Sequence, residues 1–395
     1  MKALKKIISS VPFVKRVIRF TLSKMKELKP VPCIVKYRSK GSKKGTHVCA
    51  FRHGNAGDAL LPVVLRDLFN EKIGVSRWKI RNVVKNVTKK DVKCYNKQDF
   101  IVVGGGGLFL KDTNPNDVSG WQWPCSIDRL NGINVPLIIF AVGYNRFRDQ
   151  DDFSDVFTEN LNALVEKASF VGLRNHGSID NVKRYLKNDY LKQKIVFQPC
   201  MTTMISKIYP DLVDYEHKEN KIALNCAFDR QKLRGITEEK LVDIASVVKL
   251  LSEKARIVVY GHVNSDMAIL PYLDRQNVVY EKKLFESPLD MIKEYSSVKL
   301  VIGMRGHAQM IPFGCQTPIL SIVTHDKMQW FLNDIGRPEW GCDILHPNFK
   351  ENLLKKAFDI FDNYSLYHEQ VIVSQDYLWN ITTENLAKIT KLLET

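Results

Sequence analysis

One short segment of the chain carries an arginine and a histidine two residues apart, Arg305 and His307. The apolar run 298–302 comes just before them and predicts a buried strand. Ligands collect where the strands of an open α/β sheet end. An arginine offers a planar fork for a phosphate or carboxylate, and a histidine offers a proton that titrates near neutral pH. The segment therefore predicts an anionic ligand held beside a proton donor.

A second arginine stands in the same kind of position. Arg174 ends the predicted strand 170–173, and the residues after it, through Ser178, predict the start of a helix. The amides of that helix would face the ligand. Arg174 and Ser178 are therefore candidate anion-binding residues. A third polar group, His325, Asp326 and Lys327, follows the predicted strand 319–323.

Four consecutive glycines, Gly104–Gly107, follow the predicted strand 100–103. They let a backbone approach a ligand closely and point its amides at an anion, which makes Gly105 and Gly106 candidate donor-binding positions. The equally weighted alternative is a tight strand-to-helix turn. The run fits neither GxGxxG nor the GxxxxGK[ST] phosphate loop, so it does not favour a dinucleotide or ATP.

Two weaker sites are candidates for an acceptor sugar. Asn55 and Asp58 lie in a glycine-bearing turn after the predicted strand 47–51, where they would meet hydroxyls, although Asp58 is also a natural helix cap. Trp121 and Trp123 lie in a polar loop, where indoles stack on sugars or close a small core.

The net charge of +16 is concentrated at the N-terminus. Residues 1–46 hold fourteen lysines or arginines and one acid, and apolar residues recur among them at helical spacing. This basic amphipathic pattern favours, by a small margin, binding of residues 1–30 to an anionic membrane surface, where each basic group adds about 1 kcal/mol. The alternative is a helix packed on the rest of the protein. Nucleic acid is a poor fit, because the arm lacks interleaved aromatics and the rest of the chain is nearly neutral.

The length of 395 residues predicts two domains. Short apolar strands alternate with helices, which predicts parallel, doubly wound sheets, and the pattern restarts after the polar residues 218–221. We expect an α/β fold of two Rossmann-like domains in a GT-B-like arrangement. Its parts would be an arm and linker at 1–46, domains at 47–212 and 213–349, and helices at 350–395 that pack back on the first domain. The expected strands are 47–51, 100–103, 135–142, 170–173, 195–197, 222–225, 257–260, 278–280, 298–302 and 319–323.

Eight scattered cysteines form no CxxC pair, which favours a reducing cytoplasm and predicts no metal site. No apolar run approaches eighteen residues, and the interrupted N-terminus does not fit a signal peptide. We therefore expect a cytoplasmic protein, peripheral on the inner face of the membrane if the arm binds there.

Taken together, these motifs resemble the polysaccharide pyruvyl transferase family. The resemblance spans roughly residues 47–335. It rests on GNAGD (54–58), GGGGLF (104–109), LRNHGS (173–178), GMRGHA (303–308), and GCQTPILSI (314–322) with the later Lys327. One departure is Asn175, where the family usually has an aspartate.

The resemblance implies a GT-B-like fold and transfer of the pyruvyl group of phosphoenolpyruvate to a sugar, as a ketal. It implies that Arg174 and Arg305 bind the donor's anionic groups and that His307 binds the donor or acts as general acid. It implies no other cofactor. The acceptor would be a cell-surface glycan or its lipid-linked precursor.

Two other classes of function fit parts of the pattern. A nucleotide-sugar glycosyltransferase of GT-B fold would use the arginines for a diphosphate and would release UDP or GDP. A non-catalytic glycan-binding member of the fold would bind saccharide without depending on His307. The presence of both Arg305 and His307 argues mildly against the latter.

Overall fold

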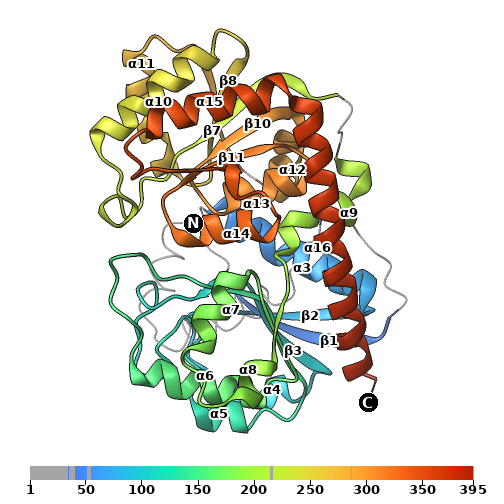
Figure 1. The fold of residues 1–395 in the computed structure, drawn as a ribbon. Coiled ribbons are helices and arrows are strands. Elements are labelled where there is room, and N and C mark those ends of the chain that lie inside the picture. Colours follow the sequence, from blue (N-terminus) through green and yellow to red (C-terminus); the bar gives the residue numbers. More distant parts are fainter. Residues whose placement is uncertain (1–33, 35–40, 51–54, 214–216, 286, 395) are drawn as a thin grey trace, which may run out of the picture. The chain divides into compact units, whose positions relative to one another are not determined.

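The computed structural model describes residues 34, 41–50, 55–213, 217–285 and 287–394. The prediction for the arm at 1–30 lies outside these residues. Residues 34–395 form one compact unit, which contains two six-stranded sheets (Figure 1). All strand pairs in both sheets are parallel. The α/β class with two parallel-sheet domains is confirmed.

The first sheet has the strand order β2-β1-β3-β4-β5-β6. The chain runs from β1 to β2 on one side and then crosses to β3 on the other, so a topological switch point lies between β1 and β3. The helices α3 to α8 connect the strands. The elements are β1 (Lys43–Cys49), α3 (Ala56–Lys72), β2 (Val75–Asn82), α4 (Lys89–Tyr95), β3 (Phe100–Phe109), α5 (Ile127–Asn131), β4 (Leu137–Tyr144), α6 (Asp155–Lys167), β5 (Phe170–Leu173), α7 (His176–Lys183), α8 (Asp189–Gln193) and β6 (Ile195–Phe197).

The second sheet has the order β12-β11-β10-β7-β8-β9, so its switch point lies between β7 and β10. Short helices link the two sheets: η1 (Met201–Met204), α9 (Ile205–Ile208) and η2 (Pro210–Leu212). The second domain comprises β7 (Glu219–Asn225), η3 (Lys232–Arg234), α10 (Glu238–Leu251), β8 (Arg256–Gly261), η4 (Asn264–Ile269), α11 (Leu270–Arg275), β9 (Tyr280–Leu284), α12 (Pro288–Ser297), β10 (Val298–Gly303), α13 (His307–Gly314), β11 (Ile319–Val323), α14 (Asp326–Asp334), η5 (Pro338–Trp340), β12 (Gly341–Asp343) and α15 (Phe349–Asp362).

The last helix, α16 (Tyr364–Leu392), connects the two domains (Figure 1). The Gln375 amide donates to the carbonyls of Thr203, in η1, and Phe313, in α13, at 3.2 and 2.7 Å. Farther along α16, the Asn385 amide donates to the carbonyl of Phe197, at the end of β6. The C-terminal helix therefore returns to the first domain after α15 has packed on the second.

Several boundaries differ from the expected ones. β1 begins at Lys43, so part of the predicted linker is a strand. The edge strand β2 was not predicted, because its sequence VSRWKIRN is mostly polar and half-exposed. β9 covers Tyr280–Leu284 and not 278–280. β3 continues through Gly104–Gly107 to Phe109, so the interpretation of these glycines as a strand-to-helix turn is wrong.

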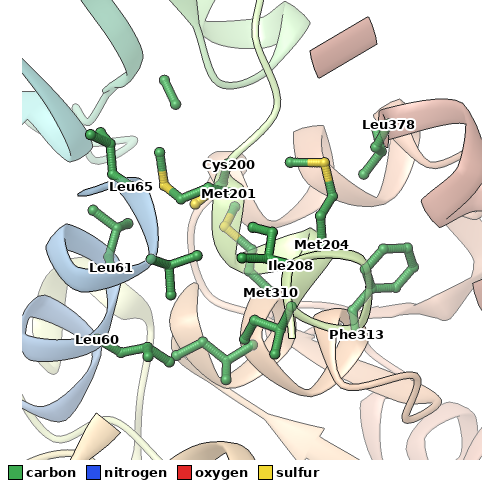
Figure 2. Packing of buried hydrophobic residues seen from close by; sticks show 14 of the residues in the cluster. Leu60, Leu61, Leu65, Cys200, Met201, Met204, Ile208, Met310, Phe313 and Leu378 are labelled. Carbon is green, nitrogen blue, oxygen red and sulfur yellow. The ribbon is translucent and has the colours of Figure 1, made fainter. Parts of the chain in front are cut away.

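A central apolar cluster joins the two domains. Leu60, Leu61 and Leu65 of α3 pack with residues of η1 and α9 (Figure 2). Met310 and Phe313 of α13 and Leu378 of α16 complete the same cluster. Two further clusters cover the opposite face of each sheet. The N-termini of α3 and α13 are thereby held close to each other, and both lie at switch points.

Candidate active site

Arg174 follows β5 and lies across the end of the first sheet. Its side chain is buried, with 7% exposure, and its Nε has no hydrogen-bond partner. A methyl group at Gly143 would overlap the guanidinium, and one at Gly107 would lie 3.2 Å from its Nη2. Burial lowers the pKa of Arg174. Gly143 and Gly107 therefore leave space for the guanidinium of Arg174. No carboxylate of the described residues forms an ion pair with it.

Lys327, in the first turn of α14, brings a second cation to this place. Its Nζ donates to Oδ1 of Asn145 at 2.8 Å, and the amide of Asn145 lies beside Gly107 and Arg174. Burial, followed by the charges of Arg174 and Arg234, lowers the pKa of Lys327 well below its usual value. No ion pair of the described residues includes Lys327, although the charge of Asp229 acts on it favourably, so the second domain adds another basic group without a directly paired carboxylate.

His307 is the first residue of α13 and comes from the second switch point. Its imidazole packs on Gly57, near the start of α3, where a methyl group would overlap it. Its Nε2 is buried and has no hydrogen-bond partner. Burial, Arg174, Lys327 and Arg305 together lower the pKa of His307 to about 3, so the imidazole is neutral at pH 7 in the ligand-free protein.

Arg305 is bound by carboxylates of its own protein. Its Nε donates to both oxygens of Asp266, at 3.0 and 2.9 Å, and its Nη2 lies 2.5 Å from Asp266 Oδ1. Its Nη1 lies 2.8 Å from Asp229 Oδ1. Asp266 is fully buried and also accepts from the backbone amide of His262. Arg305 is therefore already neutralised in this state, unlike Arg174 and Lys327.

The two glycine candidates differ in what surrounds them. Gly105 has a φ of +80° and faces Leu61, which a methyl group there would overlap. Gly106 has a φ of +96°, and no atom lies within 4 Å of a methyl group built on it. Gly105 therefore serves the packing of β3 against α3, whereas Gly106 borders open space next to Gly107 and Arg174.

Ser178 and Asn175 hold the backbone around Arg174. Ser178 Oγ accepts from the backbone amide of Tyr144 at 2.9 Å, and Ser178 is fully buried. Asn175 Oδ1 accepts from the backbone amide of Ser178 at 2.7 Å and caps α7. Asparagine and aspartate cap helices about equally well, so Asn175 performs the capping for which an aspartate would also serve.

The structure corrects the expectations for the acceptor residues. Asn55, not Asp58, caps α3: its Oδ1 accepts from the amides of Gly57 and Asp58 at 3.1 and 3.4 Å. Trp121 and Trp123 have 0% and 1% exposure and pack edge-to-face in the core. Trp121 Nε1 donates to Asn160 Oδ1 at 2.9 Å. No indole face is left for a sugar, because this polar loop closes a small core.

The sequence alone did not assign a role to several polar residues of the site: Asn145, Asp229, Asp266, His325 and Lys327. The available signal was their place just after strands or in the next turn. A cavity of about 620 Å³ lies elsewhere, along β9 and η4, and contains none of these residues. The basic side chains without an ion-pair partner, and not this cavity, therefore mark the candidate site. Among the described residues no group of three or more His, Cys, Asp or Glu could hold a metal ion.

The sequence profile described as "Polysaccharide pyruvyl transferase" matches residues 55–326, more than half of the chain. The chain belongs to the polysaccharide pyruvyl transferase family. The four basic residues of the candidate site lie within or next to the matched region. Arg174, Arg305 and His307 are inside it, and Lys327 is one residue beyond its end. The search of curated proteins found no match.

Solved structures share the fold of this family member at low identity. S. aureus MnaA with UDP has a TM-score of 0.51 at 13% identity, over 84% of this chain and 91% of the other. Anabaena HepE with UDP and glucose has 0.51 at 11%, over 89% and 100%. UDP-GlcNAc 2-epimerase from Neisseria meningitidis, bound to UDP-GlcNAc, has 0.50 at 11%, over 87% and 100%. These likenesses establish the GT-B-like fold.

No helix among the described residues combines the length and the apolar character that a membrane span requires.

Proposed function

We propose that this transferase uses phosphoenolpyruvate as its donor and binds the donor's phosphate and carboxylate between Arg174 and Lys327. The observation that carries the proposal is a pair of basic side chains, one from each domain: Arg174 is buried and Lys327 half-buried, and neither forms an ion pair with a carboxylate of the described residues. Keeping such cations in a folded protein is costly unless a ligand pairs with them. A small ligand with two anionic groups satisfies both.

Arg305 has a different role in this proposal. Because Asp266 and Asp229 already hold its guanidinium, we assign it as a positioning residue. It fixes the turn between β10 and α13, and this turn places His307 against Gly57. The direct binding of the donor by Arg305, which the resemblance implies, would have to use the guanidinium N–H groups that Asp266 and Asp229 do not engage, or displace one of these carboxylates.

His307 is the proposed general acid. Its buried Nε2 lacks a partner among the described residues, and burial together with the surrounding basic groups lowers its pKa and keeps the imidazole neutral until a ligand arrives. A bound donor with several negative charges would offset those cations and raise the pKa of His307. Binding of phosphoenolpyruvate would thereby favour the protonated form of His307, which is the form that acts as the acid. Without phosphoenolpyruvate, His307 would stay unprotonated.

The transfer of the pyruvyl group would take three steps. His307 delivers a proton to the methylene carbon of the enol, and the adjacent carbon becomes cationic. A sugar hydroxyl adds to that carbon and gives up its proton, which restores the histidinium. A second hydroxyl then displaces phosphate, forms the ketal, and its proton leaves with the phosphate. The backbone of Gly106 borders open space next to Gly107 and Arg174, where the phosphoenolpyruvate would bind.

Donor turnover tests the proposal. The purified protein is incubated with phosphoenolpyruvate and lipid-linked glycans, and free phosphate is measured together with the acceptor's mass. We expect phosphate release with a pyruvyl-sized mass increase. Release of UDP or GDP from a nucleotide sugar, with no phosphate from phosphoenolpyruvate, would overturn the proposal in favour of a glycosyltransferase.

We also propose that residues 1–30 hold the enzyme at an anionic membrane surface, near a lipid-linked acceptor. The support is the concentration of basic charge and apolar helical spacing in this arm. Flotation with anionic liposomes tests it. Equal flotation of the full-length protein and of a variant lacking residues 1–30 would contradict the proposal.

A further inference from the structure

His325, the residue just before α14, is buried, and only one of its two ring nitrogens has a hydrogen-bond partner among the described residues. His325 has 1% exposure and is the N-cap of α14, where its Nδ1 accepts from the backbone amide of Lys327 at 3.3 Å. An imidazole nitrogen that accepts from an amide carries no proton. In the neutral ring the proton is then on Nε2, and Nε2 has no partner among the described residues.

The ring is fixed in place as well as in tautomer. Phe147, from the loop after β4, packs on it with ring centroids 4.3 Å apart. Arg234 and Arg230 lie over the same phenyl ring, at 5.4 and 5.5 Å from its centroid. Arg234 Nη1 also donates to Thr324 Oγ1, one residue before His325. The Nε2–H donor therefore has a defined direction before any ligand binds.

The surroundings indicate what would accept this hydrogen bond. After burial, the charges that act on His325 are those of Lys327, Arg234, Arg174 and Arg148, and all of them disfavour the imidazolium. Arg148 and Arg234 are paired with aspartates, whereas Lys327 and Arg174 form no ion pair among the described residues, so an anion beside His325 would accept its hydrogen bond and lie near two basic groups without a carboxylate partner. Leaving such a donor unpaired destabilises the ligand-free protein.

We propose that His325 is a donor-binding residue whose neutral Nε2–H hydrogen-bonds the same anionic group that Arg174 and Lys327 hold. This inference rests on the proposed function for the identity of the anion. A neutral donor adds direction where two cations add charge, so His325 would set the orientation of the phosphate or carboxylate. It would act on donor affinity more than on the chemical step.

Two substitutions distinguish the helix-capping role of His325 from its proposed role as a hydrogen-bond donor to the anion. Asparagine is a good N-cap, so His325→Asn keeps the bond to the Lys327 amide and removes the Nε2–H. Glutamine reaches farther, so His325→Gln loses the cap and presents an N–H near the position of Nε2. His346 is the matched control, because its Nδ1 also accepts an amide two residues on, that of Asn348, but it lies exposed at the surface.

The experiment measures the KM for phosphoenolpyruvate, kcat, and calorimetric binding of phosphoenolpyruvate and of inorganic phosphate, with the thermal midpoint as a fold control. We expect His325→Asn to raise KM and Kd about tenfold or more with a smaller change in kcat, His325→Gln to recover part of the loss, and His346→Asn to match the wild type.

Unchanged affinity in a folded His325→Asn variant would overturn the inference while leaving phosphoenolpyruvate turnover by the wild type, and hence the proposed function, intact. Conversely, a wild type that does not turn over phosphoenolpyruvate but binds inorganic phosphate more tightly than His325→Asn would support the anion contact and refute the proposed donor. A wild type that binds neither anion would overturn the inference.

Discussion

Gly57 and His307 lie in contact although 250 positions separate them in the sequence: the imidazole occupies the space that a methyl group on Gly57 would need. Gly57 is the second residue of α3, and His307 is the first of α13. The two helices start at the switch points of different sheets. This contact makes the position of the imidazole that we propose as general acid depend on both domains.

We therefore predict that Gly57→Ala lowers phosphate release at least tenfold. Alanine normally favours a helix by about 1 kcal/mol over glycine, but here its methyl group would displace His307. The measurement is the steady-state rate together with thermal unfolding. Gly132→Ala is the control, because the nearest atom to its methyl group would be Val92 Cγ1, at 3.3 Å, and none of the atoms it would contact belongs to a residue of the candidate site. Wild-type activity in Gly57→Ala would show that the contact is not needed.

Replacing Arg174 by methionine should separate stability from function. The guanidinium is buried without a carboxylate partner, so an apolar side chain of similar length removes an electrostatic cost in the ligand-free protein. We expect the free energy of unfolding to rise on the order of 1 kcal/mol, and phosphoenolpyruvate binding to be lost. Denaturant unfolding in phosphate-free buffer and calorimetry measure the two effects. A less stable variant that retains binding would contradict this prediction.

Arg305→Ala should damage the fold more than Arg174→Met does. It leaves Asp266, fully buried, without its main cation, and breaking such a pair typically costs about 3–5 kcal/mol. Adding Asp266→Asn removes the orphaned charge and should recover part of that loss. A double-mutant cycle by chemical denaturation measures the coupling. Additive single effects would exclude the proposed positioning role of Arg305.

The pKa of His307 gives stability a defined dependence on pH. The folded protein holds this pKa at about 3, below the usual 6.5, so the unfolded chain binds the proton first as pH falls. The contribution of His307 to stability is therefore fully present above about pH 6.5 and is lost progressively toward pH 3. His47, a buried residue of β1, has the same direction of pKa shift, so His307→Asn should remove only part of the slope. Thermal midpoints of both proteins from pH 7.5 to 4.5 check this.

Much of this protein follows from local pattern. Apolar runs of four to eight residues, each followed by a turn and an amphipathic helix, are enough to determine two parallel α/β units. Because strand ends in such sheets collect ligands, the chemical types at Arg174, Arg305 and His307 were enough to predict an anion site. Nothing in that argument required knowing which residues touch.

Only the tertiary structure decided which of these side chains is free of a carboxylate partner and could bind a ligand. Asp266 lies 39 positions before Arg305, and only the packing of η4 against β8, at the end of the same sheet, lets it neutralise that arginine. Lys327 and Asn145 meet across 182 positions. Trp121 and Trp123 look like a sugar platform in sequence, yet the fold closes over them, since burial of large apolar rings outweighs the polarity of their neighbours. Charge balance and burial depend on long-range contacts, and a local pattern does not contain them.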